Sequence, residues 1–375
     1  MRHSFAATNP CHLYDMALAL HESGDLGCYY SGYPRWRLHP PRGFPFRSRS
    51  WRTLVTYAMQ RWPEALRIDD ARMFRWQDRG FDAAVAGILE GEGFIHGLPG
   101  QCRDIFARAR SRGWVTVLNH ASGPVRQWRA LVAPEYERMG RSLDQAMPLP
   151  LDYAERLDEE WALADLHCVA STVVRDQLVN EGVSPERIWI VPYGADRRLF
   201  GKRSTPASGP FKVCFAGRQS LRKGIHYLLK ALELTDTSGW ELHCFGMRFA
   251  ETEPDFEAYR GGAVVRQRGS LSQPEFARAL REMDVLVLPS AEEAFGLVVV
   301  QALQTGVPCI VSDRVGAGDL VREGQTGDIV PFGDAAALSA ALQDWSAKRR
   351  VVEDEFPWAA SARQLVELGN QYSNR

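Results

Sequence analysis

The sequence predicts an α/β protein with two domains, each built on a parallel sheet. The chain has 375 residues, which is more than one hydrophobic core usually supports. Short apolar runs, polar loops and helical segments alternate along it, as in open parallel sheets. Residues 201–210, GKRSTPASGP, have the composition of a linker. We therefore expect a domain boundary there, with a first domain over residues 1–205 and a second over residues 206–355.

Composition excludes several classes of function. The net charge of −1 creates no field that would attract nucleic acid, so we expect no nucleic-acid partner. The seven cysteines are scattered without a CxxC pair, which favours free thiols in a reducing compartment and argues against zinc. The N-terminus lacks the apolar region of a signal peptide, and no apolar run is long enough to span a membrane. These features predict a cytoplasmic protein.

The first domain begins with a predicted strand at residues 4–8 and a helix at 12–22, followed by a stretch of unusual charge. Residues 26–63 hold seven arginines and no acid, with nine Tyr, Trp and Phe side chains interleaved. Guanidinium groups suit phosphate, so the stretch predicts contact with an anionic acceptor or an anionic membrane surface, and we single out Arg47, Arg49 and Arg52. The alternative is a solvated loop whose arginines pair with acids elsewhere in the fold.

His120 follows a predicted strand at residues 114–118. Open parallel sheets bind ligands at the carboxyl ends of their strands, so this histidine is a candidate site residue. The alternative is a histidine that is simply packed or lies on the surface.

The second domain opens with a predicted strand at residues 211–216, then Gly217 and Arg218, then Lys223 at the start of a helix. Two cations five residues apart, on a loop between strand and helix, can neutralise a pyrophosphate. The alternative is two ordinary surface charges.

Residues 284–311 carry the strongest pattern of the chain. A buried strand at 285–288 leads through a polar turn to Glu293, Gly296 and an apolar helix at 297–305 that Gly306 ends. The free N–H groups and the dipole of that helix N-terminus favour an anion, and Gly296 lets a ligand approach the backbone closely.

These motifs resemble the retaining glycosyltransferases of the GT-B fold, in particular family 4, also called glycosyl transferases group 1. The resemblance implies two Rossmann-like, doubly wound domains that face a central cleft, with residues 356–375 as a C-terminal helix that packs back on the first domain. It also implies transfer of a hexose from a UDP- or GDP-linked sugar to a sugar or lipid-linked acceptor, in synthesis of a cell-surface glycan or glycolipid. No metal ion and no further cofactor are expected, and a peripheral location on the cytoplasmic membrane face fits such an acceptor.

The resemblance also assigns roles along the chain. Catalytic roles fall on Glu293, Arg218, Lys223 and His120, and the donor site takes these residues: Gly217, Arg218, Lys223, Arg268, Glu293, Ala294, Phe295, Gly296, Leu297 and Gln301. Gln301 departs from the family, which has a second glutamate there that binds the ribose hydroxyls. We expect its side chain to point back toward the ligand loop and to bind the donor more weakly than a carboxylate would.

Other functions remain as alternatives. The glutamine at position 301 keeps open a non-catalytic subunit that binds nucleotide sugars or acts as a scaffold. A nucleotide-sugar epimerase and a phosphorylase share the fold, although the second is far longer and carries a pyridoxal lysine. An NAD dehydrogenase is disfavoured because no GxGxxG motif follows a strand.

Overall fold

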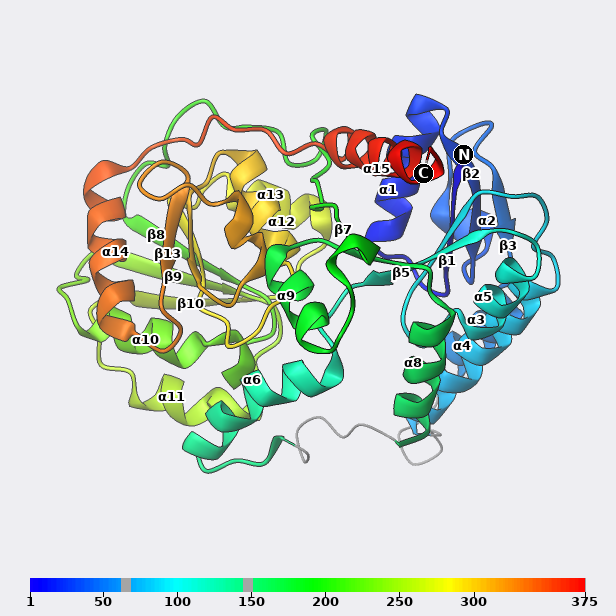
Figure 1. Cartoon of the computed structure of the whole chain (residues 1–375). Coiled ribbons are helices and arrows are strands. Elements are labelled where there is room, and N and C mark those ends of the chain that lie inside the picture. Colours follow the sequence, from blue (N-terminus) through cyan, green and yellow to red (C-terminus); the bar gives the residue numbers. More distant parts are fainter. Residues whose placement is uncertain (62–68, 144–150, 375) are drawn as a thin grey trace.

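The chain forms two parallel β-sheets with helices on their faces, in a computed structural model that describes residues 1–61, 69–143 and 151–374 (Figure 1). Residues 62 and 63, the end of the arginine-rich stretch, lie outside the described residues. The first sheet has the order β3-β2-β1-β4-β5-β6-β7. Its strands are β1 (His3–Ala7), β2 (Leu26–Ser31), β3 (Phe46–Ser48), β4 (Phe94–Gly97), β5 (Val115–His120), β6 (Leu166–Val169) and β7 (Ile188–Ile190).

The second sheet has the order β10-β9-β8-β11-β12-β13, and neighbouring strands in both sheets are parallel. Its strands are β8 (Phe211–Ala216), β9 (Trp240–Phe245), β10 (Val264–Gly269), β11 (Val285–Leu288), β12 (Cys309–Ser312) and β13 (Gly327–Val330). In each sheet the strand that comes first in sequence, β1 or β8, lies inside the sheet. It pairs with the next strand on one side and with a later strand, β4 or β11, on the other, which is the doubly wound arrangement that the sequence predicts.

Helices connect these strands. Those of the first half are α1 (His12–Ser23), α2 (Arg35–Leu38), α3 (Trp51–Met59), α4 (Asp70–Ala86), α5 (Arg103–Arg110), α6 (Val125–Arg138), α8 (Leu151–Leu163), α9 (Thr172–Asn180) and the 3-10 turn η2 (Pro185–Arg187). Those of the second half are η3 (Leu221–Lys223), α10 (Ile225–Glu233), η4 (Ala250–Thr252), α11 (Glu253–Ala258), α12 (Gln273–Leu280), α13 (Leu297–Thr305), η5 (Gly316–Leu320), α14 (Ala335–Lys348) and α15 (Trp358–Ser373).

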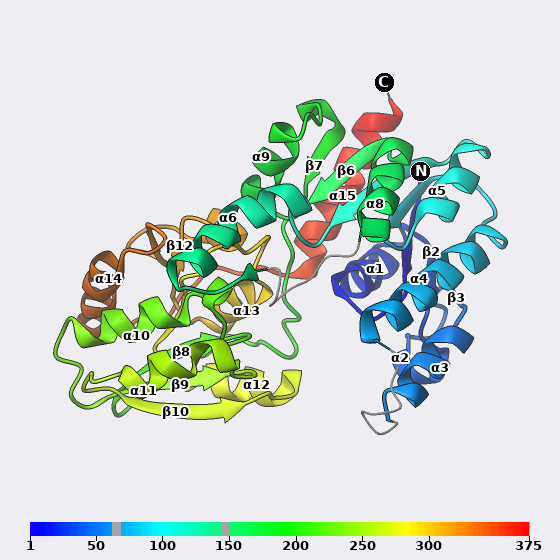
Figure 2. The same ribbon diagram turned by 90° about the horizontal axis from the view of Figure 1, so that it is seen from below.

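The C-terminal helix returns to the first half of the chain, as predicted. Figure 2 shows α15 crossing from the second sheet to lie beside α1 and the first sheet, and α1 and α15 are in contact. Ala362 and Leu365 are buried in the same cluster as Phe5 and Leu20. Burying this apolar face stabilises the attachment by about 25 cal/mol for each Å² removed from water.

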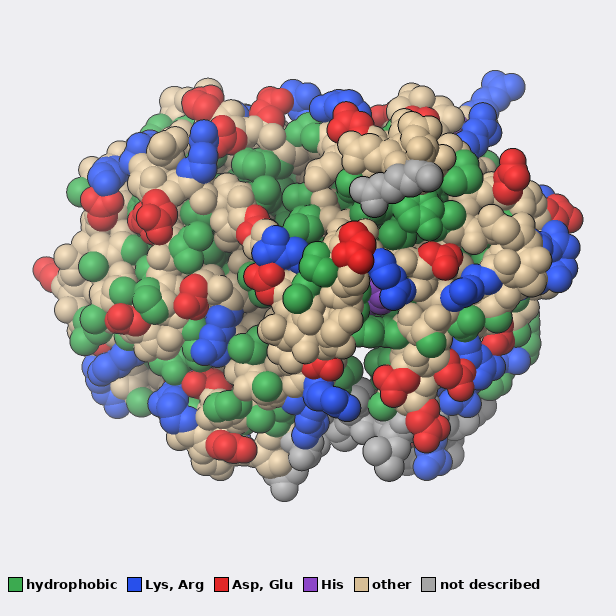
Figure 3. All heavy atoms as spheres, viewed as in Figure 1, with side chains coloured by type: hydrophobic (Ala, Val, Ile, Leu, Met, Phe, Trp, Pro, Cys, Tyr) green, Lys and Arg blue, Asp and Glu red, His purple; other side chains and the backbone are tan. Residues whose placement is uncertain are grey.

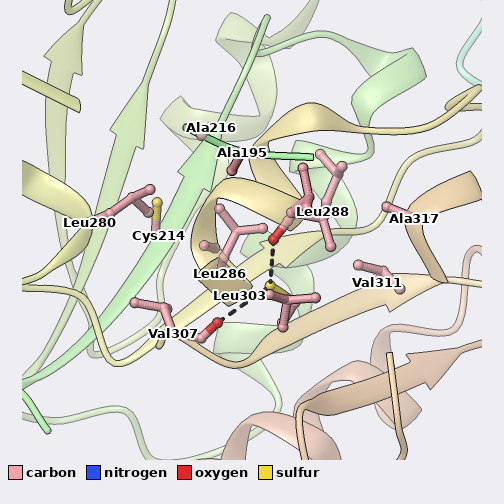
Figure 4. Close-up of a cluster of buried hydrophobic side chains, with 14 of the residues drawn as sticks. Ala195, Cys214, Ala216, Leu280, Leu286, Leu288, Leu303, Val307, Val311 and Ala317 are labelled. Carbon is pink, nitrogen blue, oxygen red and sulfur yellow. Dashed lines mark hydrogen bonds between the residues drawn. The ribbon is translucent and has the colours of Figure 1, made fainter. Parts of the chain in front are cut away.

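A second core lies between β8, β11, β12 and α13 (Figure 4). Leu286 and Leu303 in it are fully buried. Cys309 points into the same cluster, and its thiol lies 3.7 Å from the carbonyl oxygens of Val299 and Val307. The predicted strand–helix–strand unit at residues 285–312 is confirmed, with α13 ending at Gly306 in the left-handed region, φ 89°.

Part of the arginine-rich stretch is buried, whereas the sequence predicts that the stretch forms a surface. It forms β2, α2, β3 and α3, and its aromatic side chains Tyr29, Tyr30 and Phe44 are buried. The reason is that helices cover both faces of β2: Tyr29 lies in one core cluster with residues of α1, and Tyr30 lies in another with residues of α4. Arg47 pairs with Glu90 at 3.3 Å, as the solvated alternative expects.

Among the described residues, no helix is long and apolar enough to cross a membrane.

Candidate active site

Three glycines meet where β8, β9 and β10 end. Gly217 has φ 138° and donates its N–H to the oxygen of Phe245 at 3.0 Å. Gly246 has φ 105°, and a Cβ there would lie 2.1 Å from the carbonyl oxygen of Gly217. Gly246 also donates to the carbonyl oxygen of Gly269 at 2.7 Å. Because glycine has no side chain, a ligand can approach the backbone closely at this edge of the sheet. Open parallel sheets bind their ligands at this edge, where the carboxyl ends of the strands lie.

Lys223 and Glu293 form an ion pair at this edge, although 70 residues separate them in sequence. Lys223 ends η3, and Glu293 lies in the loop between β11 and α13. Their side chains are only 12% and 16% exposed. Two hydrogen bonds fix the backbone of Glu293: its N–H donates to Arg314 at 3.1 Å, and its carbonyl oxygen accepts from Gly316 at 2.9 Å. The structure thus brings together two residues that the sequence places in the site independently.

Burial, together with the nearby cations Arg222 and Arg218, lowers the pKa of Lys223 to about 7, although Glu292 acts in the opposite direction. The contact with Glu293 also favours the charged ammonium. An ammonium in this setting is poised to lose its proton near neutrality, and a ligand that brings negative charge would hold it protonated.

A second pair, Arg222 and Glu292, lies directly beside the first and was missed from the sequence. The Nη1 of Arg222 donates to the carboxylate of Glu292 at 3.1 Å and to its main-chain oxygen at 2.8 Å. Burial raises the pKa of Glu292, whereas Arg222, Lys223 and a hydrogen bond with Trp128 lower it. The N–H of Ala291 donates to the carbonyl oxygen of Arg222 at 2.8 Å. These bonds join the loop of Lys223 to the loop of Glu293. In the sequence, the single indication of a role for Arg222 and Glu292 is that each directly precedes a predicted site residue.

Gly224 lets these two loops approach each other. It has φ 71°, and a Cβ there would lie 1.9 Å from the carbonyl oxygen of Pro289. Arg218, by contrast, is exposed, and its guanidinium carbon lies 5.8 Å from the ring centre of Phe249. Arg218 therefore lies near the edge of the site, where its charge still contributes to lowering the pKa of Lys223.

The N-terminus of α13 faces the same loop. Its cap residue Gly296 has φ 94°, and the described contacts give it no side-chain cap. Ala294 and Phe295 are buried, whereas Leu297 is 36% exposed. Phe295 packs edge-on against Tyr193 at 4.9 Å between ring centres. The helix N-terminus is thus rigidly placed, with N–H groups available for an anion.

Gln301 and Arg268 lie on the β10 side of the site. The amide nitrogen of Gln301 donates to the side-chain oxygen of Gln273 at 3.1 Å, at the start of α12. Arg268 is exposed and donates through Nε to Nδ1 of His243 at 3.2 Å. The side chain of Gln301 is therefore held toward the loop that follows β10.

His120 is the last residue of β5, rather than part of the following loop, and is buried. Its Nε2 lies 2.9 Å from Nδ1 of His167, and burial lowers the pKa of His120 well below its usual value. It lines a cavity of about 420 Å³ together with Ser122, Tyr153 and Trp161. A neutral imidazole in a cavity wall can accept or donate one hydrogen bond to a ligand.

The two halves of the chain meet beside the Glu293 loop. Ser171, the N-cap of α9, donates its hydroxyl to the carbonyl oxygen of Ala294 at 2.7 Å. Glu135 of α6 lies 2.7 Å from Nε2 of His226 and accepts from Tyr227 at 3.0 Å, both on α10. Because α6 and α9 belong to the first half and α10 and Ala294 to the second, these contacts join the two halves of the chain.

Comparison with known proteins finds a family likeness in the second half of the chain. Residues 196–363 match the family model described as glycosyl transferases group 1. This segment contains all of the predicted donor residues from Gly217 to Gln301.

Curated relatives match over part of their length. A D-inositol 3-phosphate glycosyltransferase of Corynebacterium efficiens is 32% identical over 255 residues, which cover 58% of this chain and 60% of that protein. The protein WcaL of Salmonella typhimurium, to which glycosyl transfer in colanic acid biosynthesis is ascribed, is 26% identical over 259 residues, which cover 63% of this chain and 58% of that protein. The chain therefore spans less than two thirds of each of these relatives.

The fold extends the likeness to the whole chain. The Anabaena protein HepE, solved in complex with UDP, superposes with a TM-score of 0.60 at 13% identity and covers 100% of this chain and 99% of its own. The chain thus has a GT-B fold, as the sequence predicts: the matched segment contains the second sheet, and the first sheet supplies the other half.

Proposed function

We propose that the chain is a glycosyltransferase that moves a hexose from a nucleotide-diphosphate sugar to an acceptor hydroxyl. One observation carries the proposal: the Lys223–Glu293 pair lies beside the N-terminus of α13, at the carboxyl ends of the β8 and β11 strands. A cation and free helix N–H groups suit a diphosphate, and a carboxylate next to them suits sugar hydroxyls.

The residues divide the work of donor binding. The backbone at Gly217 allows the diphosphate to approach, and Lys223 and the N-terminus of α13 stabilise the negative charge that develops on it as the sugar leaves. Arg218 adds charge from the edge of the site. Glu293 accepts hydrogen bonds from the donor sugar, which orients the anomeric carbon toward the acceptor. Gln301 lies on the side where the nucleoside would bind.

The reaction is proposed to retain the anomeric configuration and to need no metal ion, since Lys223, Arg218 and the helix N-terminus supply the charge stabilisation that a divalent cation gives elsewhere. His120 is proposed to contact the reacting sugar from the first half of the chain. The acceptor, a sugar or a lipid-linked sugar, is proposed to bind on that half. The free cysteines favour a reducing compartment, so we place the reaction in the cytoplasm.

The test is a panel of UDP- and GDP-linked sugars, beginning with UDP-sugars because HepE is described in complex with UDP. Thermal stabilisation reports binding, release of nucleoside diphosphate reports turnover, and proton NMR of the product reports the anomeric configuration. Activity should survive EDTA. Loss of turnover in EDTA that added Mg²⁺ restores would refute the metal-independent mechanism.

A second function rests on Gln301, which bonds to Gln273 where the family has a carboxylate. The chain would then bind a nucleotide sugar without transferring it. Stabilisation by a donor with neither hydrolysis nor transfer, which Gln301→Glu then restores, would favour this alternative.

A further inference from the structure

Helix α6 reaches from the first half of the chain to the turn that carries Lys223. That turn is η3, which begins at Leu221, and α6 and η3 are in contact. Leu221 is fully buried in one cluster with Val132 and Tyr136 of α6. A side chain of the second half is thus enclosed by side chains of the first half, two residues before Lys223.

Tyr136 also forms hydrogen bonds at this turn. Its hydroxyl donates to Oε1 of Glu251 at 3.0 Å, and the same carboxylate oxygen accepts the N–H of Leu221 at 2.9 Å. Burial raises the pKa of Tyr136 and Glu251 acts in the same direction, whereas the charge of Arg222 and a hydrogen bond with its main chain lower it. One hydroxyl of the first half therefore bonds to η3 directly at Arg222 and, through Glu251, at Leu221.

These bonds satisfy the N–H groups at the start of η3. The first N–H groups of a helical turn have no partner within the turn. Glu251 accepts from Leu221, Tyr136 bonds to the main chain of Arg222, and the N–H of Lys223 donates to the carbonyl oxygen of Ser220 at 3.1 Å. Groups outside η3 thus fix its backbone, and with it the point from which the side chain of Lys223 extends.

The same face of α6 also contacts the second loop of the site. Trp128, Val132 and Tyr136 are spaced by four residues, so they share one face of the helix. Trp128 forms a hydrogen bond with the carboxyl group of Glu292. Figure 3 shows side chains of both charges and apolar side chains mixed over α6 and α10. The ordered contacts lie beneath that surface, since Tyr136 is only 2% exposed.

We propose that Tyr136 is a positioning residue for Lys223. From the first half, and together with Glu251, it holds η3 so that the ammonium group of Lys223 faces the donor diphosphate. This inference rests on the proposed function for the identity of the ligand. It means that the second half does not build the diphosphate site alone, because a hydroxyl of the first half completes the turn that carries the cation.

The experiment measures the affinity of the full chain for UDP and GDP by titration calorimetry. The variants are Tyr136→Phe, Lys223→Met and the two combined. Tyr136→Phe keeps the ring in its cluster and removes the hydroxyl, so it should weaken nucleoside diphosphate binding by about fivefold, as for one lost hydrogen bond. With Lys223→Met already present, Tyr136→Phe should have no further effect, because residues that act through one another are not additive.

Tyr227→Phe is the matched control. It removes another tyrosine hydroxyl between α6 and α10, one that donates to Glu135 at 3.0 Å, and it should leave the affinity unchanged. Three results would overturn the proposal: wild-type affinity in Tyr136→Phe, the same loss in Tyr227→Phe, or an equal effect of Tyr136→Phe with and without Lys223. The last two would mean that the variant only loosens the contact between the halves, and thermal unfolding of every variant measures that loosening separately.

Donor hydrolysis is measured on the same proteins. A wild-type chain that binds UDP or GDP but neither hydrolyses nor transfers any donor sugar refutes the proposed transferase function, and the affinities still decide the role of Tyr136. Active wild-type protein with additive effects of Tyr136→Phe and Lys223→Met refutes the positioning role alone. Failure of the wild type to bind either nucleotide would overturn both.

Discussion

We expect the protonation state of Lys223 to set the pH above which kcat/KM for the donor falls. Burial lowers its pKa to about 7, so its ammonium is present below that pH and is lost above it. A neutral amine cannot stabilise the leaving diphosphate, and kcat/KM reports the ionisation of the free enzyme. Wild-type kcat/KM for the donor should therefore fall by about tenfold for each pH unit above that pKa, because one unit corresponds to a tenfold change in the protonated fraction.

Two substitutions test whether the positive charge of Lys223 is what matters: one keeps the charge and the other removes it. Lys223→Arg keeps a cation at every accessible pH, so the fall in kcat/KM at high pH should disappear even if the rate at neutral pH drops. Lys223→Met removes the cation and should cost about 2–4 kcal/mol of transition-state stabilisation, as for the loss of an oxyanion donor. That loss corresponds to about 30-fold to 1000-fold in kcat/KM.

The assay follows release of nucleoside diphosphate from about pH 6 to pH 9, with circular dichroism at each pH to show that the protein stays folded. Glu293→Gln is the companion variant, because it removes the carboxylate in contact with Lys223 and should shift the high-pH limit downward. If Lys223→Arg keeps the wild-type pH profile, or Lys223→Met keeps near-normal turnover, Lys223 does not bind the diphosphate.

Three further predictions test neighbouring parts of the site. Glu292→Gln leaves the guanidinium of Arg222, which is 20% exposed, without its charged partner, and should lower the free energy of unfolding by about 2 kcal/mol in chemical denaturation; an unchanged midpoint would show that the pair is dispensable. Gln301→Glu should tighten donor binding by about 1 kcal/mol with little change in melting temperature, whereas a lower melting temperature at unchanged affinity refutes its ribose role. Gly224→Ala places a Cβ 1.9 Å from a main-chain oxygen, and its loss of stability should exceed that of Gly209→Ala, which has a similar φ of 83° and no heavy atom nearby to meet. The left-handed backbone alone costs about 1–2 kcal/mol, so equal losses in the two variants would mean that the loops simply move apart.

Local sequence patterns predicted the elements that carry the donor site. The apolar run of β11, the apolar helix α13 and the glycines at 296 and 306 lie within one continuous stretch of chain. Each depends on contacts between near neighbours in sequence and on backbone angles that favour glycine, so the pattern alone suffices. Local pattern also placed Lys223 on a loop beside a helix. The C-terminal helix was predicted in another way, from the resemblance of residues 356–375 to the family.

Tertiary structure decided which of these side chains meet. The contacts between Lys223 and Glu293, and between Arg222 and Glu292, depend on β8 and β11 being neighbours in the sheet, which no local pattern specifies. Packing of α1 against the sheet explains why Tyr29 is buried within an arginine-rich stretch. The same stretch shows the limit again, because a run of charges in sequence emphasised Arg47, whereas packing of α3 against α4 brings Arg52 into contact with Trp76, which lies 24 residues later. The sequence determined the local elements because short-range sterics and apolar periodicity encode them, and the fold alone determined the site because its contacts join residues that are distant along the chain.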